Sequence, residues 1–267
     1  MSLKIVVLAK QVPDTRNVGK DAMTAEGTVN RQALDAIFNP EDLNALEMAL
    51  AIKDKKKDTH ITVVSMGPDR ASEIIRDAMF RGADDGIIVS DKKLAGSDTL
   101  ATSYAISQAI KKLGKVDIVF GGRQAIDGDT AQVGPQTAEK LEYPQITYAE
   151  ELIDVTDKDI IIKRRLERGV ETVKANLPLL ITVHSSAPKA RFYNAKRLMA
   201  YKNAEVKIWN ADDIQADDTR LGLTGSPTKV KKIDSVVLTH KDNITIEPTG
   251  EAIDGLMKEL INSHIIG

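Results

Sequence analysis

The sequence contains no cysteine among its 267 residues, and its net charge is only -2. Without cysteine there can be no disulfides, no Cys-ligated iron–sulfur clusters and no thiolate catalysis, a composition that fits a cytoplasmic protein. The near balance of charge gives no broad field for nucleic acid or for an anionic membrane. Apolar runs long enough to cross a membrane are also missing. We therefore expect a cytoplasmic protein that binds no nucleic acid and does not insert into membranes.

Histidine and tryptophan are scarce. The histidines are His60, His184, His240 and His264. They are scattered, without the spacing of metal ligands and without a nucleophile beside them. The sequence therefore predicts no metal site and no catalytic residue. The one tryptophan, Trp209, lies in a stretch with little else to bury, and it packs either on a partner protein or on its own domain.

Apolar runs alternate with amphipathic segments in the first half of the chain. The predicted strands are residues 4–10, 60–67, 85–90 and 116–122. The predicted helices are residues 42–57, 69–82 and 98–114. Such an alternation is typical of a parallel sheet that is covered on both faces. The sequence predicts an α/β fold with a Rossmann-like doubly wound parallel sheet. Because the first run lacks a basic leader and a cleavage site, we expect no signal peptide.

The second half is organised differently. Residues 159–178 alternate with period two on either side of Arg168-Gly169, which predicts an added β-hairpin, and residues 178–183 form a further apolar strand. From about His184 to Ile233 the periodicity is weak, and only residues 250–263 regain a helical stripe. Because a long segment without its own core is unusual in a compact domain, we expect it to pack on a partner. The predicted units are a domain at 1–183 and an extended C-terminal arm at 184–267.

One strand end is rich in glycine. The stretch GGRQAIDGDTAQVGP spans residues 121–135, and ligands of open parallel sheets bind beyond such carboxyl ends. Its glycine backbone and the amides around Gly128 can approach a phosphate. Asp129 can cap a helix that starts at Thr130, with Gln132 as its capping-box partner, or the helix restarts at Pro135. These features predict a nucleotide site, although neither a P-loop nor a GxGxxG fingerprint is present.

A second helix start lies in FNPEDLNALE. Asn39 is the expected N-cap, and Pro40 takes the first helical position. Carboxylates accept hydrogen bonds from ribose hydroxyls, so Asp42 and Asp127 suit the sugar of a nucleotide.

Taken together, these segments resemble the β subunit of electron-transfer flavoproteins. The resemblance rests on GGRQAIDGDTAQVGPQTAEKL, FNPEDLNALE, VVSMGP and KRRLERGVETVKANLPLLIT, which occur in the family's order. The last segment departs from the family signature at Arg168, where Gly or an acid is usual. The resemblance covers the chain to about Met199 and includes LGLTGSPTKV. It implies a heterodimer in which the α subunit carries one FAD and the β subunit supplies a second nucleotide site.

Two variants point to the electron-bifurcating branch of that family. Ordinary members hold AMP and read N-P-F-C where this chain reads Asn39-Pro40-Glu41-Asp42, and this chain also has SDKKLAGSDTLAT at residues 90–102. In the bifurcating branch the β site holds FAD, which takes a hydride from NADH. One electron passes to ferredoxin or flavodoxin, and the other passes through the α-subunit FAD to an acyl-CoA dehydrogenase-type partner. Residues 1–183 would then be the nucleotide-binding domain, and residues 184–267 would pack on the α subunit.

The resemblance also implies a set of cofactor-binding residues. They are Leu8, Ala9, Lys10, Asn39, Pro40, Glu41, Asp42, Met66, Asp91, Ser97, Thr99, Thr102, Gly122, Arg123, Gln124, Ala125, Ile126, Asp127, Gly128, Asp129, Thr130, Ala131, Gln132 and Val133. Residues 8–10 and Met66 would contact adenine, and residues 124–129 would follow the ribose and pyrophosphate. Arg123 would either stabilise a reduced flavin or be a solvated charge. The residues between Asp91 and Thr102 would meet NADH, unless Ser97 or Asp98 only caps a helix.

Three alternatives remain open at this point. The chain is either the bifurcating subunit, a non-bifurcating β subunit with structural AMP, or an ATP/AMP-binding module of the same architecture. The family docks dehydrogenases through a leucine on a loop, and Ala195 takes that position here within APKARFYNAKRLM. This loop either docks a dehydrogenase or is a solvated basic loop.

Overall fold

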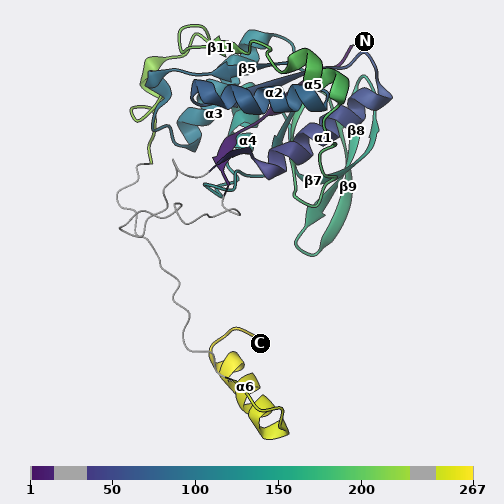
Figure 1. Cartoon of the computed structure of the whole chain (residues 1–267), viewed down its shortest axis with the longest axis vertical. Coiled ribbons are helices and arrows are strands. Elements are labelled where there is room, and N and C mark those ends of the chain that lie inside the picture. The colour runs from purple at the N-terminus through teal and green to yellow at the C-terminus, as the bar shows by residue number, and fades with distance from the viewer. Residues whose placement is uncertain (1, 15–34, 229–244, 267) are drawn as a thin grey trace.

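The computed structural model describes residues 2–14, 35–228 and 245–266. One sheet runs in the order β11-β5-β4-β1-β6-β10-β7-β8-β9. Figure 1 shows β11 and β5 at one end of the sheet and β7, β8 and β9 at the other. Its strands are β1 (Lys4–Leu8), β4 (His60–Met66), β5 (Asp85–Val89), β6 (Ile118–Gly122), β7 (Gln145–Val155), β8 (Asp159–Leu166), β9 (Gly169–Asn176), β10 (Leu179–Val183) and β11 (Lys207–Trp209). All neighbours from β11 to β7 are parallel, and β8 and β9 are antiparallel. The predicted Rossmann-like α/β fold is confirmed.

Helices cover both faces of the sheet. The described α-helices are α1 (Pro40–Lys55), α2 (Ser72–Arg81), α3 (Thr99–Leu113), α4 (Val133–Leu141), α5 (Ala195–Tyr201) and α6 (Gly250–Asn262), of which α1 to α4 bury residues against the sheet. Leu46 of α1 and Ile75 of α2 are buried in one apolar cluster with Val7 of β1. Ile110 of α3 and Ala138 of α4 are buried in a second cluster. Since successive residues of a strand point to opposite faces, each fully apolar strand contributes to both clusters.

The order of the strands creates a switch point between β1 and β6. From β1 the chain builds outward through β4 and β5, and it then returns to place β6 and β10 on the other side of β1. The last paired residues of β1 and β6 are Val7 and Phe120. Ligands of doubly wound sheets bind at this place, where the loops after two adjacent strands diverge.

The hairpin is close to its prediction, and one strand was not expected. Leu166 pairs with Gly169, so the turn residues are Glu167 and Arg168, one position earlier than predicted.

Strand β7 pairs with both β10 and β8. Its burial is irregular, with only scattered residues inside, and it contains a register shift. A broken pattern of this kind hides a strand from a search for alternation.

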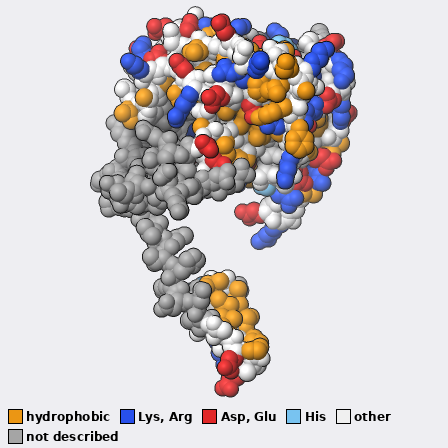
Figure 2. All heavy atoms as spheres, viewed as in Figure 1, with side chains coloured by type: hydrophobic (Ala, Val, Ile, Leu, Met, Phe, Trp, Pro, Cys, Tyr) orange, Lys and Arg blue, Asp and Glu red, His pale blue; other side chains and the backbone are white. Residues whose placement is uncertain are grey.

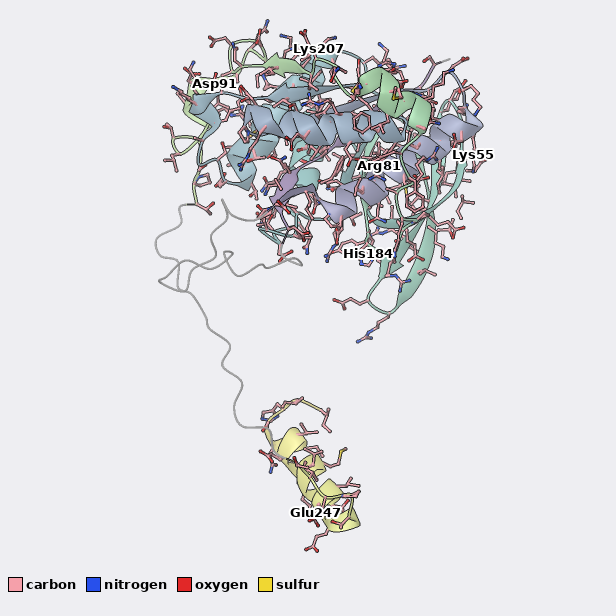
Figure 3. The ribbon with its side chains drawn as sticks, in the orientation of Figure 1. Lys55, Arg81, Asp91, His184, Lys207 and Glu247 are labelled. Atoms are coloured by element: carbon pink, nitrogen blue, oxygen red, sulfur yellow. The ribbon has the colours of Figure 1, made fainter. Side chains whose placement is uncertain are left out.

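Part of the stretch 184–233, which is described as far as residue 228, packs on its own domain, and the sequence did not indicate this. That the stretch also packs on an α subunit stays a prediction. Strand β11 extends the sheet beside β5. Ala211, Ile214 and Leu221 are at most 2% exposed and belong to the α3 cluster, against which Trp209 also packs. Arg81 of α2 donates to the carbonyl of Arg191, close to α5 (Figure 3). These residues therefore pack on their own domain; positions 229–233 lie outside the described residues.

Helix α6 differs from every other described helix of comparable length because none of its residues is buried. Its apolar side chains include Ile253, Met257 and Ile261, which are 49%, 44% and 51% exposed. They form a continuous stripe along the helix (Figure 2). Thr249 caps its first turn by accepting from the amide of Ala252, as a stable helix start requires. Within the described ranges, no helix is both long and apolar enough to cross a membrane.

Candidate nucleotide site at the switch point

The first turn of α1 is directed at the loop that follows β6. Asn39 takes the predicted N-cap position and Pro40 the first helical position, but the Asn39 side chain makes no cap. Its amide group instead donates to the carbonyl of Gln124 at 2.9 Å, and its Oδ1 accepts from the amide of Ile126 at 3.2 Å. Asn39 is fully buried. Asn39 therefore holds the loop after β6 from inside the protein.

Two carboxylates of the same turn hold the preceding part of the loop. Glu41 accepts from the amide of Gln124 at 3.1 Å and pairs with Arg123 at 3.1 Å. Asp42 accepts from the amide of Lys10 through Oδ2 and from the amide of Gly122 through Oδ1, both at 2.9 Å. Because these acids are 5% and 7% exposed, they are nearly closed to solvent.

The pKa of Asp42 is shifted toward neutral pH. Burial raises its pKa to about 7, although the amides of Lys10 and Gly122 act in the opposite direction. Arg123 forms an ion pair with Glu41, and the ammonium nitrogen of Lys10 forms one with a carboxylate oxygen of Asp127 at 2.7 Å. Within the described residues, Asp42, like Asp129, thus has no cationic partner.

Gly122 is required by the close approach of α1. A Cβ at this position would lie 2.5 Å from Oδ1 of Asp42 and 2.8 Å from its backbone nitrogen. A Cβ at Gly128 would meet nothing within 4 Å. The first glycine therefore serves internal packing, and the second faces open space.

The loop before α4 leaves several backbone donors unused. In the part of the chain that is described, no acceptor bonds the amides of Thr130, Ala131 and Gln132. Helix α4 begins at Val133 with Gln132 as an N-cap residue whose side chain makes no cap. Positive φ angles at Asp129 and Ala131, 49° and 53°, turn the backbone between these donors. An uncapped helix start beside free amides is the arrangement that binds a phosphate.

The predicted capping by Asp129 is wrong. No helix starts at Thr130 or at Pro135, because the left-handed backbone at Asp129 precedes the helix and Pro135 lies inside its first turn. The Asp129 carboxylate accepts from the side chain of Gln124 at 2.7 Å. This contact keeps the acid off the free amides, as the nucleotide interpretation requires.

Other predicted residues gather at the same edge. Leu8 and Ala9 are buried at the end of β1, and Met66 is half-buried at the end of the adjacent β4. Asp127 is engaged by Lys10, and Asp42 by two amides, so neither carboxylate is free as a ribose acceptor. The structure therefore assigns both acids internal partners that the sequence did not predict.

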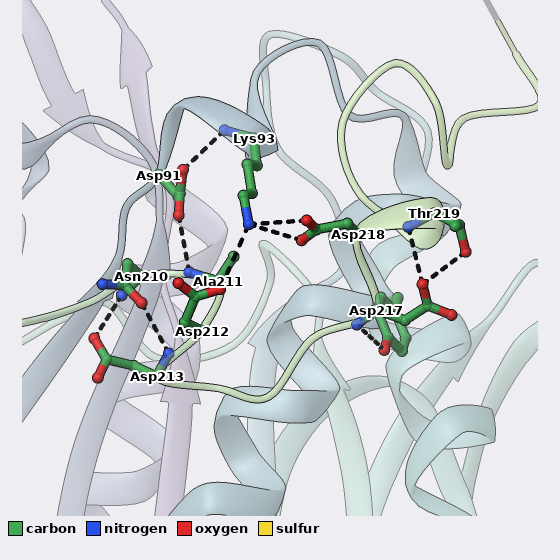
Figure 4. Close-up of polar contacts among 10 residues, drawn as sticks. Asp91, Lys93, Asn210, Ala211, Asp212, Asp213, Asp217, Asp218 and Thr219 are labelled. Carbon is green, nitrogen blue, oxygen red and sulfur yellow. Dashed lines mark hydrogen bonds and ion pairs between the residues drawn. The ribbon is translucent and has the colours of Figure 1, made fainter.

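The residues predicted for NADH lie along the β5 end and the start of α3. Asp91 caps a short 3₁₀ turn by accepting from Lys93 and also accepts from Ala211, while Lys93 pairs with Asp218 (Figure 4). Hydrogen bonds from Lys93 and Ala211 hold the pKa of Asp91 below its usual range. These contacts fasten the loop after β5 to the segment after β11.

The start of α3 is already capped. Asp98 accepts from the amides of Leu100 and Ala101, so the alternative in which Asp98 caps the helix is confirmed. Asp98 also accepts from the amide and the hydroxyl of Thr228. Ser97 donates to the carbonyl of Leu94, which leaves it outside the cap.

A hydrogen bond connects the start of α3 to the loop before α4. Thr99 donates to Gln132 at 2.8 Å, and the carboxamide of Gln136 lies against Thr99 and Ser103. Thr102 is half-buried in the same turn. The two predicted groups of residues are therefore neighbours, joined through side chains of α3 and α4.

An aromatic pair beside Arg123 was missed by the sequence analysis. The Arg123 guanidinium lies 5.9 Å from the ring centre of Tyr148, and that ring lies 6.0 Å from His184. Tyr148 has a φ of 60°, unusual for a tyrosine inside a strand. Only the strand β7, which was itself not predicted, brings it here.

Comparisons with known proteins identify the family of this chain. Residues 26–214 match the family described as "Electron transfer flavoprotein domain". The chain is 48% identical to "Electron transfer flavoprotein subunit beta" of Megasphaera elsdenii over 277 residues, which cover 99% of this chain and 100% of that relative. It is 43% identical to the protein of the same name in Clostridium acetobutylicum over 264 residues, with coverage of 99% and 100%. It is 41% identical to "Caffeyl-CoA reductase-Etf complex subunit CarD" of Acetobacterium woodii over 265 residues, again with coverage of 99% and 100%.

Proposed function

Because this chain belongs to the electron transfer flavoprotein family, among its β subunits, we propose that it pairs with an α subunit and binds FAD at the switch point between β1 and β6. The observation that carries the proposal is the uncapped start of α4 beside the free amides of Thr130, Ala131 and Gln132. These donors suit the two negative charges of a pyrophosphate. Open space at Gly128 leaves room for it.

The chain's own residues would bind and orient the cofactor. The predicted contacts are the set from Leu8 to Val133 given above, apart from the carboxylates of Asp42 and Asp127, which have internal partners. Adenine is proposed near Met66 and Asn39, and the pyrophosphate at residues 122–130. A bound FAD would supply the redox chemistry: acceptance of a hydride from NADH, and transfer of one electron to ferredoxin or flavodoxin and of the other to the α-subunit FAD. Arg123 lies at the edge of the site, and its pairing with Glu41 fixes the position of its charge.

NADH is proposed to approach from the side of Asp91 to Thr102. With the amides of Leu100 and Ala101 capped by Asp98, we propose that the hydroxyls of Thr99 and Thr102 contact it, Thr99 by exchanging its hydrogen bond to Gln132. A Thr99→Val, Thr102→Val double variant should weaken the dependence of flavin reduction on NADH. Rapid mixing of the heterodimer with NADH measures this, and an unchanged dependence would place the dinucleotide elsewhere.

The partner surfaces are proposed from exposure. We assign the exposed apolar stripe of α6 to the interface with the α subunit. The last helix of the proposed C-terminal arm, residues 184–267, therefore remains the part that is proposed to pack on the partner. An acyl-CoA dehydrogenase-type flavoenzyme is proposed to dock on the loop before α5. Phe192 is 96% exposed there and Met199 is 70% exposed, while Arg191 fixes the loop by pairing with Glu47. The relative CarD belongs by its name to a caffeyl-CoA reductase complex, which supports a partner of this class.

Counting flavins tests the proposal. The chain is co-expressed with its α subunit, reconstituted with FAD and purified, and the FAD per heterodimer is measured by absorbance after denaturation. Two FAD molecules per heterodimer are expected. One FAD together with one AMP would identify the non-bifurcating form, and an adenine nucleotide without any flavin would identify a nucleotide-binding module.

A further inference from the structure

Three side chains at the start of α1 accept hydrogen bonds from every second backbone amide between residues 122 and 126, where β6 ends and the next loop begins. Asp42 accepts from Gly122, Glu41 accepts from Gln124, and Asn39 accepts from Ile126. All three acceptors are at most 7% exposed. Since buried acceptors hold their donors in fixed directions, this turn sets the path of the loop.

Asp42 alone reaches both strands of the switch point. Pairing of β1 with β6 ends at Val7 and Phe120. Beyond that pair, the carboxylate of Asp42 stands between the two chains, with one oxygen on the amide of Lys10 and the other on the amide of Gly122. It thereby continues the connection of the two strands at the point where their loops separate.

We infer that Asp42 is a positioning residue of the proposed cofactor site: its carboxylate fixes the spacing of the β1 and β6 ends and so the placement of the loop that receives the pyrophosphate. The inference rests on the proposed function and deepens it. Asp42 acts on the cofactor through the amides of Lys10 and Gly122, and the ribose hydroxyls are left to other groups. Both oxygens must accept, which the ionised carboxylate does without conflict and the protonated acid does not.

The charged groups around Asp42 come from each element packed against it. They are Glu41 of the same turn, Lys10 after β1, and Arg123 and Asp127 of the loop. Glu41 pairs with Arg123, and Lys10 pairs with Asp127. Burial is therefore the largest influence on the pKa of Asp42 and raises it to about 7. Hydrogen bonds from the Lys10 amide, the Asn39 side chain and the Gly122 amide lower this pKa, and the charge of Glu41 raises it.

The test compares Asp42→Asn with the unmodified chain in the heterodimer. Asparagine keeps the shape, but its NH₂ group faces one of the two amides, so one strand end is released. FAD affinity of the unmodified protein should tighten by about tenfold between pH 6 and pH 8, as a group with a pKa of about 7 ionises. Asp42→Asn should bind FAD about tenfold more weakly at pH 8 and show a flat profile. Glu73→Gln, an exposed carboxylate in α2, is the matched control and should keep the profile.

Each result has one meaning. Equal affinity and an equal pH profile in Asp42→Asn and the unmodified protein would overturn the inference. If Asp42→Asn does not fold, hydrogen exchange in the unmodified heterodimer decides. Protection of the Lys10 and Gly122 amides, corrected for intrinsic rates, should rise from pH 6 to pH 8, and constant protection would overturn the inference. A heterodimer that binds no FAD at any pH contradicts the proposed function, while the exchange measurement still tests the role of Asp42.

Discussion

Replacing Gly122 by alanine tests the closest internal contact of the site. The added Cβ would lie 2.5 Å from Oδ1 of Asp42 and 2.8 Å from the backbone of Glu41 and Asp42. Backbone cannot move aside as a flexible side chain can, so the start of α1 must shift away from β6. Overpacking of this kind costs about 1–3 kcal/mol. The shift also breaks the Gly122–Asp42 hydrogen bond, and a bond to a charged group contributes about 1.5–3 kcal/mol.

The expected loss for Gly122→Ala is therefore about 3–5 kcal/mol in the free energy of unfolding. With a urea m-value of about 3 kcal/mol/M, the midpoint falls by about 1–2 M. The assay is urea unfolding of the chain purified with its α subunit, followed by circular dichroism at a fixed protein concentration.

Gly128→Ala is the matched control in the same loop. Its Cβ meets nothing within 4 Å and its φ lies outside the left-handed region, so the midpoint should stay or rise slightly, by the equivalent of about 0.4–1 kcal/mol. FAD affinity should nevertheless fall in this variant, since the methyl group occupies space proposed for the cofactor. Equal midpoints for Gly122→Ala and the unmodified protein would refute the reasoning about the close approach of α1.

Two further predictions concern the α3 cap and the last helix. Burial raises the pKa of Asp98, but hydrogen bonds from Thr228 and from the α3 amides outweigh burial and leave it below its usual range. Its contribution is therefore present above about pH 4 and lost as pH falls below that. Asp98→Ala should cost about 1–2 kcal/mol of unfolding free energy at pH 7. This cost, measured by urea titration, should decrease as the pH is lowered from 4 through the lowered pKa of Asp98, and a cost that does not depend on pH would contradict this. Met257→Lys should weaken binding of the α subunit by about 10- to 100-fold, because a Met side chain contributes about 1.5–3 kcal/mol when buried. Sedimentation measures it, Lys258→Gln is the control, and unchanged assembly would exclude α6 from the interface.

The layers of the fold follow from periodicity in the sequence. The runs ending at Leu8, Met66, Val89 and Gly122 are predicted within two residues because buried parallel strands are apolar on both faces. Strand β7 escapes this reasoning, since its residues alternate irregularly between buried and exposed positions around a register shift. Short apolar pieces such as β11 are likewise too brief to show a period of their own.

The site was only partly predictable for a related reason. The glycine exit and the two helix starts are local signals, and the structure places them together. The partners of Asp42 are 32 and 80 positions away, so no local spacing indicates them. The start of α4 was misplaced because positive φ at Asp129 and Ala131 is set by the surrounding contacts. Whether the predicted residues touch FAD or NADH stays a prediction.

The hold of the α1 turn on the loop after β6 constrains how this subunit can be redesigned or can diverge. The side chains of Asn39, Glu41 and Asp42 accept hydrogen bonds from alternate backbone amides of residues 122–126. Neither segment can therefore be exchanged without the other. A graft of the loop into a relative with a different helix start would arrive without its acceptors, and a graft of the helix start would bury two acids without donors. The two segments are separated by about eighty positions in the chain, but they depend on each other structurally. In a chimera of two family members, both segments should therefore come from the same parent.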